Sequence, residues 1–272
     1  MLIAQITDLH VRPRGRPAYR VAETTMLTAR ALDALAALHP RPDVVLVTGD
    51  LVDRGLPEEY AVLRSLLGRL PMPVFVVPGN HDRRGPLREG LPAAWLPGAD
   101  GEFVHYVVDD WPVRLIGLDT VVPGADHGGL CEARLAFLEA ALAAGRNRPT
   151  VVFMHHPPFA CGMAAMDRIR LFDGEARFRA LIEAHGTVER VLCGHHHRPI
   201  QTRYAGTLAL VAPGVAHQVV LDLASEREDL LVLEPPAFQL HRYAPETGLV
   251  THMAYVERFP GPYPFAADPA SS

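Results

Sequence analysis

Short apolar runs alternate with amphipathic segments along most of this chain. Runs rich in Val, Ile and Leu predict buried strands at residues 2–7, 43–48 and 74–77. Between them an apolar stripe predicts a helix over residues 24–39, stopped by two prolines. Pro57 and the two glutamates after it are typical of the first turn of a second helix. This alternation indicates an α/β layered fold.

The alternation continues to about residue 192 and then weakens. It predicts strands at 103–108, 113–118, 150–154 and 188–192, and helices at 132–144 and 175–185. After Pro213 only short strand-like pieces remain, at 219–223, 238–243 and 250–256. We therefore expect a catalytic domain over residues 1–216 and a C-terminal extension over 217–272. The extension should pack on the core and end in a Pro-rich tail from residue 259.

Composition and charge narrow the possible partners. The chain has 272 residues, of which 49% are hydrophobic and 21% charged, as in ordinary globular proteins. No apolar run approaches the ~20 residues needed to span a bilayer, so we expect no membrane partner. A formal net charge of -5 argues against a broad basic surface for nucleic acid. A small anionic substrate would need a local positive site, which metal ions can provide.

The cysteines and the N-terminus indicate a cytoplasmic protein. Three widely spaced cysteines fit free thiols in a reducing compartment better than a disulfide framework. The first residues lack a charged segment followed by an apolar core, as a leader peptide would have.

Five short polar motifs follow predicted strands directly. They are Asp8-Leu9-His10, Gly49-Asp50, Gly79-Asn80-His81-Asp82, His155-His156-Pro157-Pro158 and Gly194-His195-His196-His197. Each motif alone has an ordinary explanation as a turn, a cap or a rigid loop. Together they supply carboxylate, amide and imidazole groups without thiolate, which suits Mn, Fe, Co, Zn or Ni. Seven ligands are too many for one tetrahedral ion, but two ions that share a carboxylate explain the number.

The order of these motifs resembles that of the calcineurin-like metallophosphoesterases, in particular the bacterial class III cyclic-nucleotide phosphodiesterase and glycerophosphodiesterase branch. The resemblance covers residues 8–197 and implies a four-layer α/β/β/α sandwich with the metals at one sheet edge. It assigns Asp8, His10 and His197 to one metal, Asn80, His155 and His195 to the other, and Asp50 to both. The cofactors would be two divalent or mixed-valence transition-metal ions, drawn from Mn, Fe, Zn and Co.

The resemblance also implies a mechanism. A metal-bridging hydroxide attacks a small phosphodiester, a 3',5'-cyclic nucleotide or a glycerophosphodiester, in line with the leaving alkoxide. Asn80 and His81 would contact the substrate, with His81 binding the phosphoryl oxygen or protonating the leaving oxygen, and Asp82 would orient His81. His156 is expected to support a ligand or face the substrate, and His217 is a further candidate for the substrate pocket.

Other functions remain open from the sequence. A phosphomonoesterase is compatible with the motifs, although the eukaryotic protein-phosphatase pattern has Glu in place of Asp82. A nuclease is disfavoured by the acidic balance. A metal-free scaffold should show decayed ligands, and none is missing here. The apolar, Pro-rich segment after residue 213 predicts a homo-oligomer, a dimer or larger, because it exceeds what the catalytic core needs.

Overall fold

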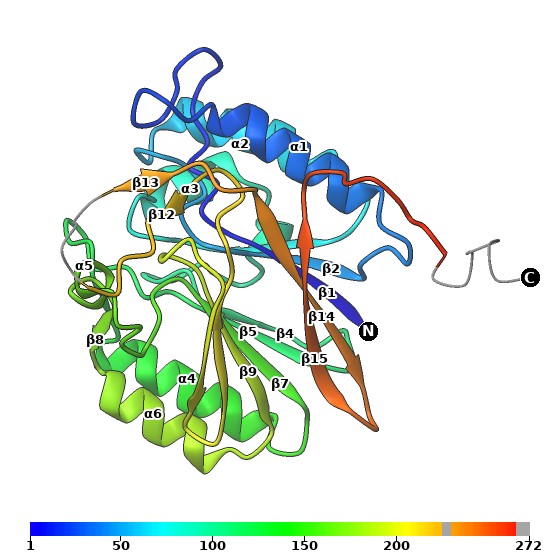
Figure 1. Cartoon of the computed structure of the whole chain (residues 1–272). Helices are drawn as coiled ribbons and strands as arrows, with labels where there is room; N and C mark the ends of the chain where they lie inside the picture. The colour runs from blue at the N-terminus through cyan, green and yellow to red at the C-terminus, as the bar shows by residue number, and fades with distance from the viewer. Residues whose placement is uncertain (225–229, 265–272) are drawn as a thin grey trace, which may run out of the picture.

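The computed structural model describes residues 1–224 and 230–264, which form two β-sheets packed face to face (Figure 1). The first sheet has the strand order β15-β14-β1-β2-β3, and the second has the order β10-β11-β9-β7-β5-β4. Helices α1 and α2 lie on the outer side of the first sheet, and α4 and α6 lie on the outer side of the second (Figure 1). The predicted four-layer α/β/β/α sandwich is confirmed.

The elements have the following bounds. The first sheet contains β1 (Leu2–Ile6), β2 (Val44–Thr48), β3 (Val74–Val77), β14 (Ala237–Ala244) and β15 (Gly248–Tyr255). The second contains β4 (Tyr106–Val108), β5 (Arg114–Leu118), β7 (Thr150–Met154), β9 (Val188–Cys193), β10 (Ile200–Tyr204) and β11 (Thr207–Val211). The helices are α1 (Thr24–Ala36), α2 (Pro57–Leu67), α3 (Arg84–Gly90), η1 (Ala93–Trp95), α4 (Glu132–Ala144), α5 (Ala164–Asp167) and α6 (Glu175–Ala184). Two short ladders pair β6 (Gly128–Gly129) with β8 (Leu171–Asp173), and β12 (Gln218–Val219) with β13 (Leu231–Val232).

The central strands are apolar throughout because both of their faces are covered. In β7, Val151 and Phe153 belong to the core between the two sheets. Val152 and Met154 belong instead to the core under α4 and α6. A strand buried on both faces has no polar side, which explains why these strands read as continuous apolar runs.

The C-terminal part differs from its expected role as an extension. Strand β14 pairs antiparallel with β1, with Leu2 opposite Arg242 and Gln5 opposite Gln239. Residues 237–255 are therefore part of the first sheet, because the outer edge of β1 needs a partner strand to satisfy its backbone groups.

Two smaller differences concern strands in the second half of the chain. Strands β10 and β11 were not predicted, and of the strand predicted at 219–223 only Val219 lies in one. Residues 265–272 of the predicted tail lie outside the described residues. Within the described ranges, none of the helices is both long and apolar enough to cross a bilayer.

Candidate metal centre

The predicted ligands come together at one edge of the sandwich because they follow parallel strands. Strands β1, β2 and β3 run parallel in the first sheet, as do β7 and β9 in the second. The carboxyl ends of these five strands point the same way, and the loops after them carry the side chains. These side chains are Asp8, His10, Asp50, Asn80, His155, His195 and His197.

Two glycines of the motifs allow this close approach. A Cβ at Gly79 would overlap the carboxylate of Asp50. A Cβ at Gly194 would overlap the Thr7 hydroxyl and the carbonyl oxygen of Thr48. The glycine before each ligand is thus required by packing between the loops rather than by a turn.

Five of the seven predicted ligands have a left-handed backbone conformation, which non-glycine residues adopt only in a few per cent of cases. Their φ angles are 55° at Asp8, 43° at His10, 47° at Asp50, 74° at His195 and 53° at His197. Such conformations carry a local cost and are concentrated at functional sites. Here they turn the side chains inward immediately after the strands end.

Asp8, His10, Asp50 and His197 form a first, buried cluster. The Nε2 atom of His197 lies 3.3 Å from Asp8 Oδ1 and 3.3 Å from His10 Nε2. His10 Nε2 lies 3.5 Å from Asp50 Oδ2. Two imidazole nitrogens and two carboxylate oxygens thus surround one point.

A second cluster begins at the other oxygen of Asp50. Asp50 Oδ1 lies 3.4 Å from His155 Nε2. The same His155 nitrogen lies 3.1 Å from Asn80 Oδ1 and 3.2 Å from His195 Nδ1. Asp50 therefore presents one carboxylate oxygen to each cluster, which is the position of a bridging ligand in a two-metal site.

Hydrogen bonds on the outer side of the imidazoles test whether this donor set fits metal ions. His155 Nδ1 donates to the Thr48 carbonyl at 2.8 Å, and His197 Nδ1 donates to the His217 carbonyl at 2.9 Å. His195 Nε2 donates to the Ile169 carbonyl at 2.9 Å. Because a carbonyl only accepts, each of these rings has its proton on the outer nitrogen and its lone pair directed into the cluster. Metal-binding histidines are oriented in this way, so the residues fit the cofactor.

The negative charge of the buried carboxylates also favours a cation in the site. Burial opposes ionisation of Asp50, but the neighbouring histidines outweigh it and hold the pKa of this carboxyl well below its usual value. Burial lowers the pKa of His155, yet Asp50 outweighs it and raises that pKa to about 9. A proton on His155 then supplies positive charge where a metal ion would otherwise supply it. Burial, together with neighbouring histidines, lowers the pKa of His195 and His197, so these rings stay neutral as ligands must be.

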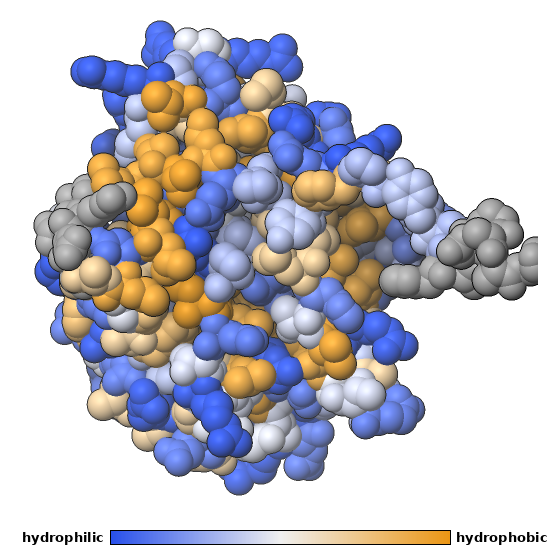
Figure 2. All heavy atoms as spheres, viewed as in Figure 1, coloured by the Kyte–Doolittle hydropathy of each residue, from blue (hydrophilic) through white to orange (hydrophobic). Residues whose placement is uncertain are grey.

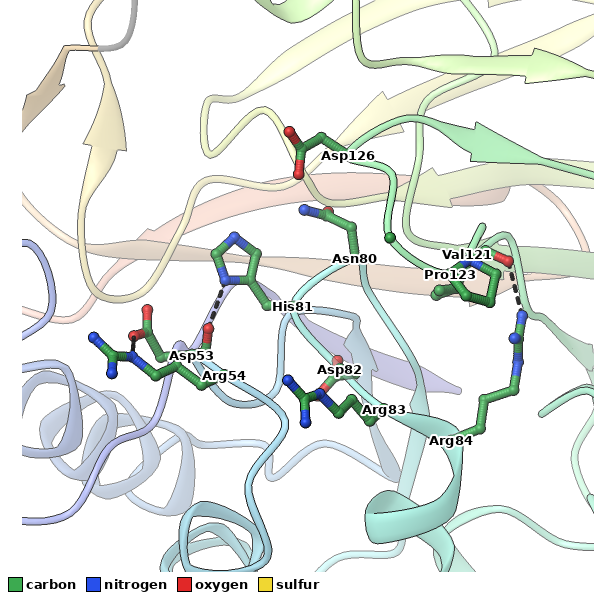
Figure 3. A pocket seen from close by; sticks show the side chains of 11 residues that line it. Asp53, Arg54, Asn80, His81, Asp82, Arg83, Arg84, Val121, Pro123 and Asp126 are labelled. Carbon is green, nitrogen blue, oxygen red and sulfur yellow. Dashed lines mark hydrogen bonds and ion pairs between the residues drawn. The ribbon is translucent and has the colours of Figure 1, made fainter.

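His81 lies at the mouth of the centre, where two hydrogen bonds hold it. Its Nδ1 donates to the Asp53 carbonyl at 2.7 Å (Figure 3). Its backbone N–H donates to Asp50 Oδ1 at 3.0 Å. Burial lowers the pKa of His81, but the Asp50 carboxylate outweighs it, so the net shift is upward. His81 and Asn80 line both a cavity of about 290 Å³ over the clusters and an adjoining groove of about 720 Å³.

The structure does not bear out the expected contact between Asp82 and His81. The Asp82 carboxylate accepts hydrogen bonds from the backbone N–H groups of Leu51 and Gly79, at 3.0 and 2.9 Å, and from the Tyr60 hydroxyl at 3.0 Å. It therefore holds the loops of Asp50 and Asn80 together, while the Asp53 carbonyl orients the His81 ring. The buried carboxylate is satisfied by these three donors.

The other two histidines named from the sequence are buried beside the clusters. His156 lies beside His195, with ring centroids 4.6 Å apart, and its Nδ1 lies 2.7 Å from Thr120 Oγ1. It is fully buried, so it supports the second cluster and does not reach the solvent-filled cavity. The His217 ring lies 4.5 Å from that of His197 and lines the cavity.

A family model for calcineurin-like phosphoesterases matches residues 1–199, the part of the chain that contains every ligand motif. The chain belongs to this family. Calcineurin-like phosphoesterases are binuclear metal hydrolases, and the structure brings His and Asp side chains together in groups that could hold metal ions.

Relatives within the calcineurin-like phosphoesterases are similar over nearly the whole chain. A probable glycerophosphodiester phosphodiesterase of Arcobacter nitrofigilis is 36% identical over 266 residues, covering 97% of each protein. A probable cyclic nucleotide phosphodiesterase of Rhodopseudomonas palustris is 36% identical, covering 88% of this chain and 86% of the relative. Among solved structures, a dimetal phosphatase from Danio rerio superimposes with a TM-score of 0.68 at 16% identity, covering 94% of this chain and 99% of that one. The last likeness shows that the fold is shared.

Three residues of this calcineurin-like site were not assigned from the sequence. Asp53 lies 3.7 Å from His10 Nδ1 and supplies the carbonyl that holds His81. Its place three residues after Asp50, in the same loop, was a signal for it. Tyr19 lines the cavity, and Asp126 lines both the cavity and the groove, but both come from loops without a recognisable motif.

Proposed function

We propose that this calcineurin-like phosphoesterase is a binuclear metal-dependent phosphodiesterase that hydrolyses a small phosphodiester, a glycerophosphodiester or a 3',5'-cyclic nucleotide. The observation that carries the proposal is the Asp50 carboxylate, because one of its oxygens faces His10 and the other faces His155. Asp8, His10 and His197 would hold one ion, and Asn80, His155 and His195 the other. The names of the relatives that are similar over nearly the whole chain support the substrate class.

The chain's own residues account for the rest of the reaction. When bound, the two cations would supply a hydroxide near neutral pH and neutralise phosphoryl charge. His81 has its Nδ1 engaged with the Asp53 carbonyl, which leaves Nε2 free for the substrate. The Asp50 carboxylate raises its pKa and so favours the protonated form, which can bind a phosphoryl oxygen or protonate the leaving oxygen. The oxygen and nitrogen ligands favour Mn, Fe, Zn or Co as the metals.

An activity panel tests this function. Protein purified without chelator should contain two transition-metal ions per chain and hydrolyse glycerophosphodiesters or cyclic nucleotides with a higher kcat/KM than simple monoesters. Higher kcat/KM for monoesters than for every diester would make it a phosphomonoesterase. Protein without metal or activity would make the fold a scaffold.

We also propose that the protein is a cytoplasmic homo-oligomer. All three cysteines are free, as in a reducing compartment. Figure 2 shows apolar side chains gathered on the face where β12 and β13 lie. Leu221, Leu223, Leu230 and Leu233 contribute to the exposed apolar surface, with exposed fractions of 56%, 65%, 47% and 55%. Such a surface is larger than isolated apolar residues explain and is typical of an interface.

Sedimentation velocity measures the oligomeric state directly. We expect a dimer or larger species that becomes smaller when Leu223→Asp and Leu230→Asp are combined. A wild-type monomer at all concentrations would contradict the proposal.

A further inference from the structure

A groove lies beside the metal centre and is lined by the loops after β2, β3 and β5. The proposed reaction at the metal centre does not use it. The groove has a volume of about 720 Å³ and shares Asn80, His81 and Asp126 with the cavity over the clusters. A diester has two arms on its phosphorus. With the phosphoryl group at Asn80 and His81, one arm can extend along this groove, and the groove's chemistry then decides which arms fit.

Three arginines line the groove, and they differ in how far acidic groups neutralise their charges. Arg84 donates two hydrogen bonds to Asp119, at 2.6 and 2.9 Å, and a third to the Val121 carbonyl at 2.8 Å. Its charge is therefore neutralised, and it serves as part of the wall. Arg54 lies 3.7 Å from Asp53 Oδ2, an oxygen that it shares with Arg12.

Arg83 differs from both. Among the described residues, its guanidinium makes no hydrogen bond or ion pair. Its aliphatic stem lies directly over Gly55, where a Cβ would overlap it. Gly55 thus provides the space for the Arg83 stem. Figure 3 shows Arg83 among the side chains that line the groove.

The acidic groups of the groove leave this cation uncompensated. Asp53 is already paired with His10, Arg12 and Arg54. Asp82 is buried and bonded to its own loops. Asp126 has no ion-pair partner in the part of the chain that the structure describes, but in Figure 3 it lies beside Asn80, on the opposite side of the groove from Arg54 and Arg83.

From these contacts we propose that the groove is a subsite for a diester arm that carries a carboxylate, which Arg83 binds and Arg54 assists. The inference rests on the proposed phosphodiesterase function and deepens it by naming the arm. A guanidinium matches a carboxylate with two parallel N–H···O bonds, and an arm without that group leaves the cation unpaired. Arg83 lines the groove but not the cavity over the clusters, so a carboxylate bound there would not compete with the phosphoryl group for the metal centre.

Two diesters that differ by one carboxylate test this subsite: glycerophosphoserine and glycerophosphoethanolamine. The wild-type holoenzyme should have a higher kcat/KM for the serine diester. Arg83→Gln should lower the serine-to-ethanolamine ratio about tenfold, the usual value of one charge-assisted hydrogen bond, and Arg83→Lys should restore part of it. Arg64→Gln removes the same charge from an exposed position on α2 outside the groove, and it should leave the ratio unchanged.

A binding measurement tests the carboxylate subsite separately from the phosphodiesterase function. Calorimetric titration of the holoenzyme with non-hydrolysable phosphonate analogues of the two diesters avoids turnover, and the serine analogue should bind more tightly than the ethanolamine analogue to the wild type but not to Arg83→Gln. Equal binding of the two diesters, or a ratio that Arg83→Gln does not change, would overturn the subsite while leaving the phosphodiesterase function intact. Failure to hydrolyse any diester together with serine-selective binding would overturn the function instead.

Discussion

Asp50 is the residue on which the two-metal interpretation depends, because its two oxygens face different clusters. Asp50→Ala removes a ligand from both ions at once. We expect less than one metal ion per chain and a loss of kcat/KM greater than about 100-fold, since even residues that only support ligands are worth ~10–100-fold. Elemental analysis and diester hydrolysis measure these effects, and circular dichroism checks folding.

The matched control is Asp33→Ala, which removes an exposed carboxylate that pairs with Arg69 on the surface. It should retain both metals and activity. An Asp50→Ala protein with two metals per chain and near-normal turnover would show that the shared-ligand assignment is wrong.

His81 provides a second prediction at this scale. His81→Ala should depress hydrolysis of alkyl diesters by ~10²-fold or more, and that of aryl diesters much less, because an aryl leaving group needs no proton. The wild-type advantage on alkyl diesters should fall as the pH rises through the raised pKa of His81, because the acid form is then lost. The ratio of the two rates in His81→Ala should not depend on pH. Equal losses on both substrates would show that His81 only holds the phosphoryl oxygen.

A buried polar chain links the C-terminal hairpin to the strands that carry the site. His241 of β14 donates from Nε2 to Gln5 Oε1 at 3.1 Å, and its Nδ1 accepts from the Thr251 hydroxyl at 2.9 Å. The Gln5 amide then donates to Thr48 Oγ1 and to the Cys193 carbonyl, at 3.0 and 2.9 Å. Thr48 and Cys193 end the strands before Asp50 and His195.

This arrangement makes part of the stability pH-dependent. Burial lowers the pKa of His241 to about 3, whereas an unfolded histidine titrates near ~6.5. As the pH falls below about 6.5, the unfolded chain takes up a proton that the folded protein does not, so folding becomes less favourable. This single group should cost about 2 kcal/mol between pH 7 and pH 5.

His241→Gln removes the titration while keeping an amide that can hydrogen-bond. We expect its free energy of unfolding to fall by about 2 kcal/mol less than that of the wild type between pH 7 and pH 5. Urea unfolding of chelator-treated protein at both pH values measures the difference, and the other buried histidines contribute equally to both proteins. Identical slopes would mean that His241 is protonated in the folded state.

At the scale of the whole molecule, the ligands come from both sheets. Asp8, Asp50 and Asn80 follow strands of the first sheet, and His155 and His195 follow strands of the second. Ions bound there would connect the two halves of the sandwich and stabilise the folded state only. Chelation should lower the Tm by about 5 °C or more, and Mn²⁺ or Zn²⁺ should restore it.

Differential scanning calorimetry tests this prediction, with Asp50→Ala as the matched variant. Its Tm should respond much less to chelator than that of the wild type. A wild-type Tm that chelation leaves unchanged would contradict metal binding across the sheets.

Features that depend on neighbouring residues were determined by the sequence itself. The helix at Glu132–Ala144 and the strands at Val74–Val77 and Thr150–Met154 have the predicted bounds, because an apolar period and flanking turn residues are local signals. The five ligand motifs were recognisable for the same reason, since each is a few residues long and directly follows a strand.

Pairing between distant segments was decided only by the tertiary structure. No local signal places β14 beside β1, which lies more than 200 residues away. Nor does one predict the hydrogen bond from His81 to the Asp53 carbonyl, or the one from the Leu51 N–H to the Asp82 carboxylate. The groove of Arg83 is likewise built from three loops that the strand order brings together. Hydrogen bonds and burial at these places depend on which backbone groups meet across the sheets, and that is a property of the packed molecule rather than of any short stretch of sequence.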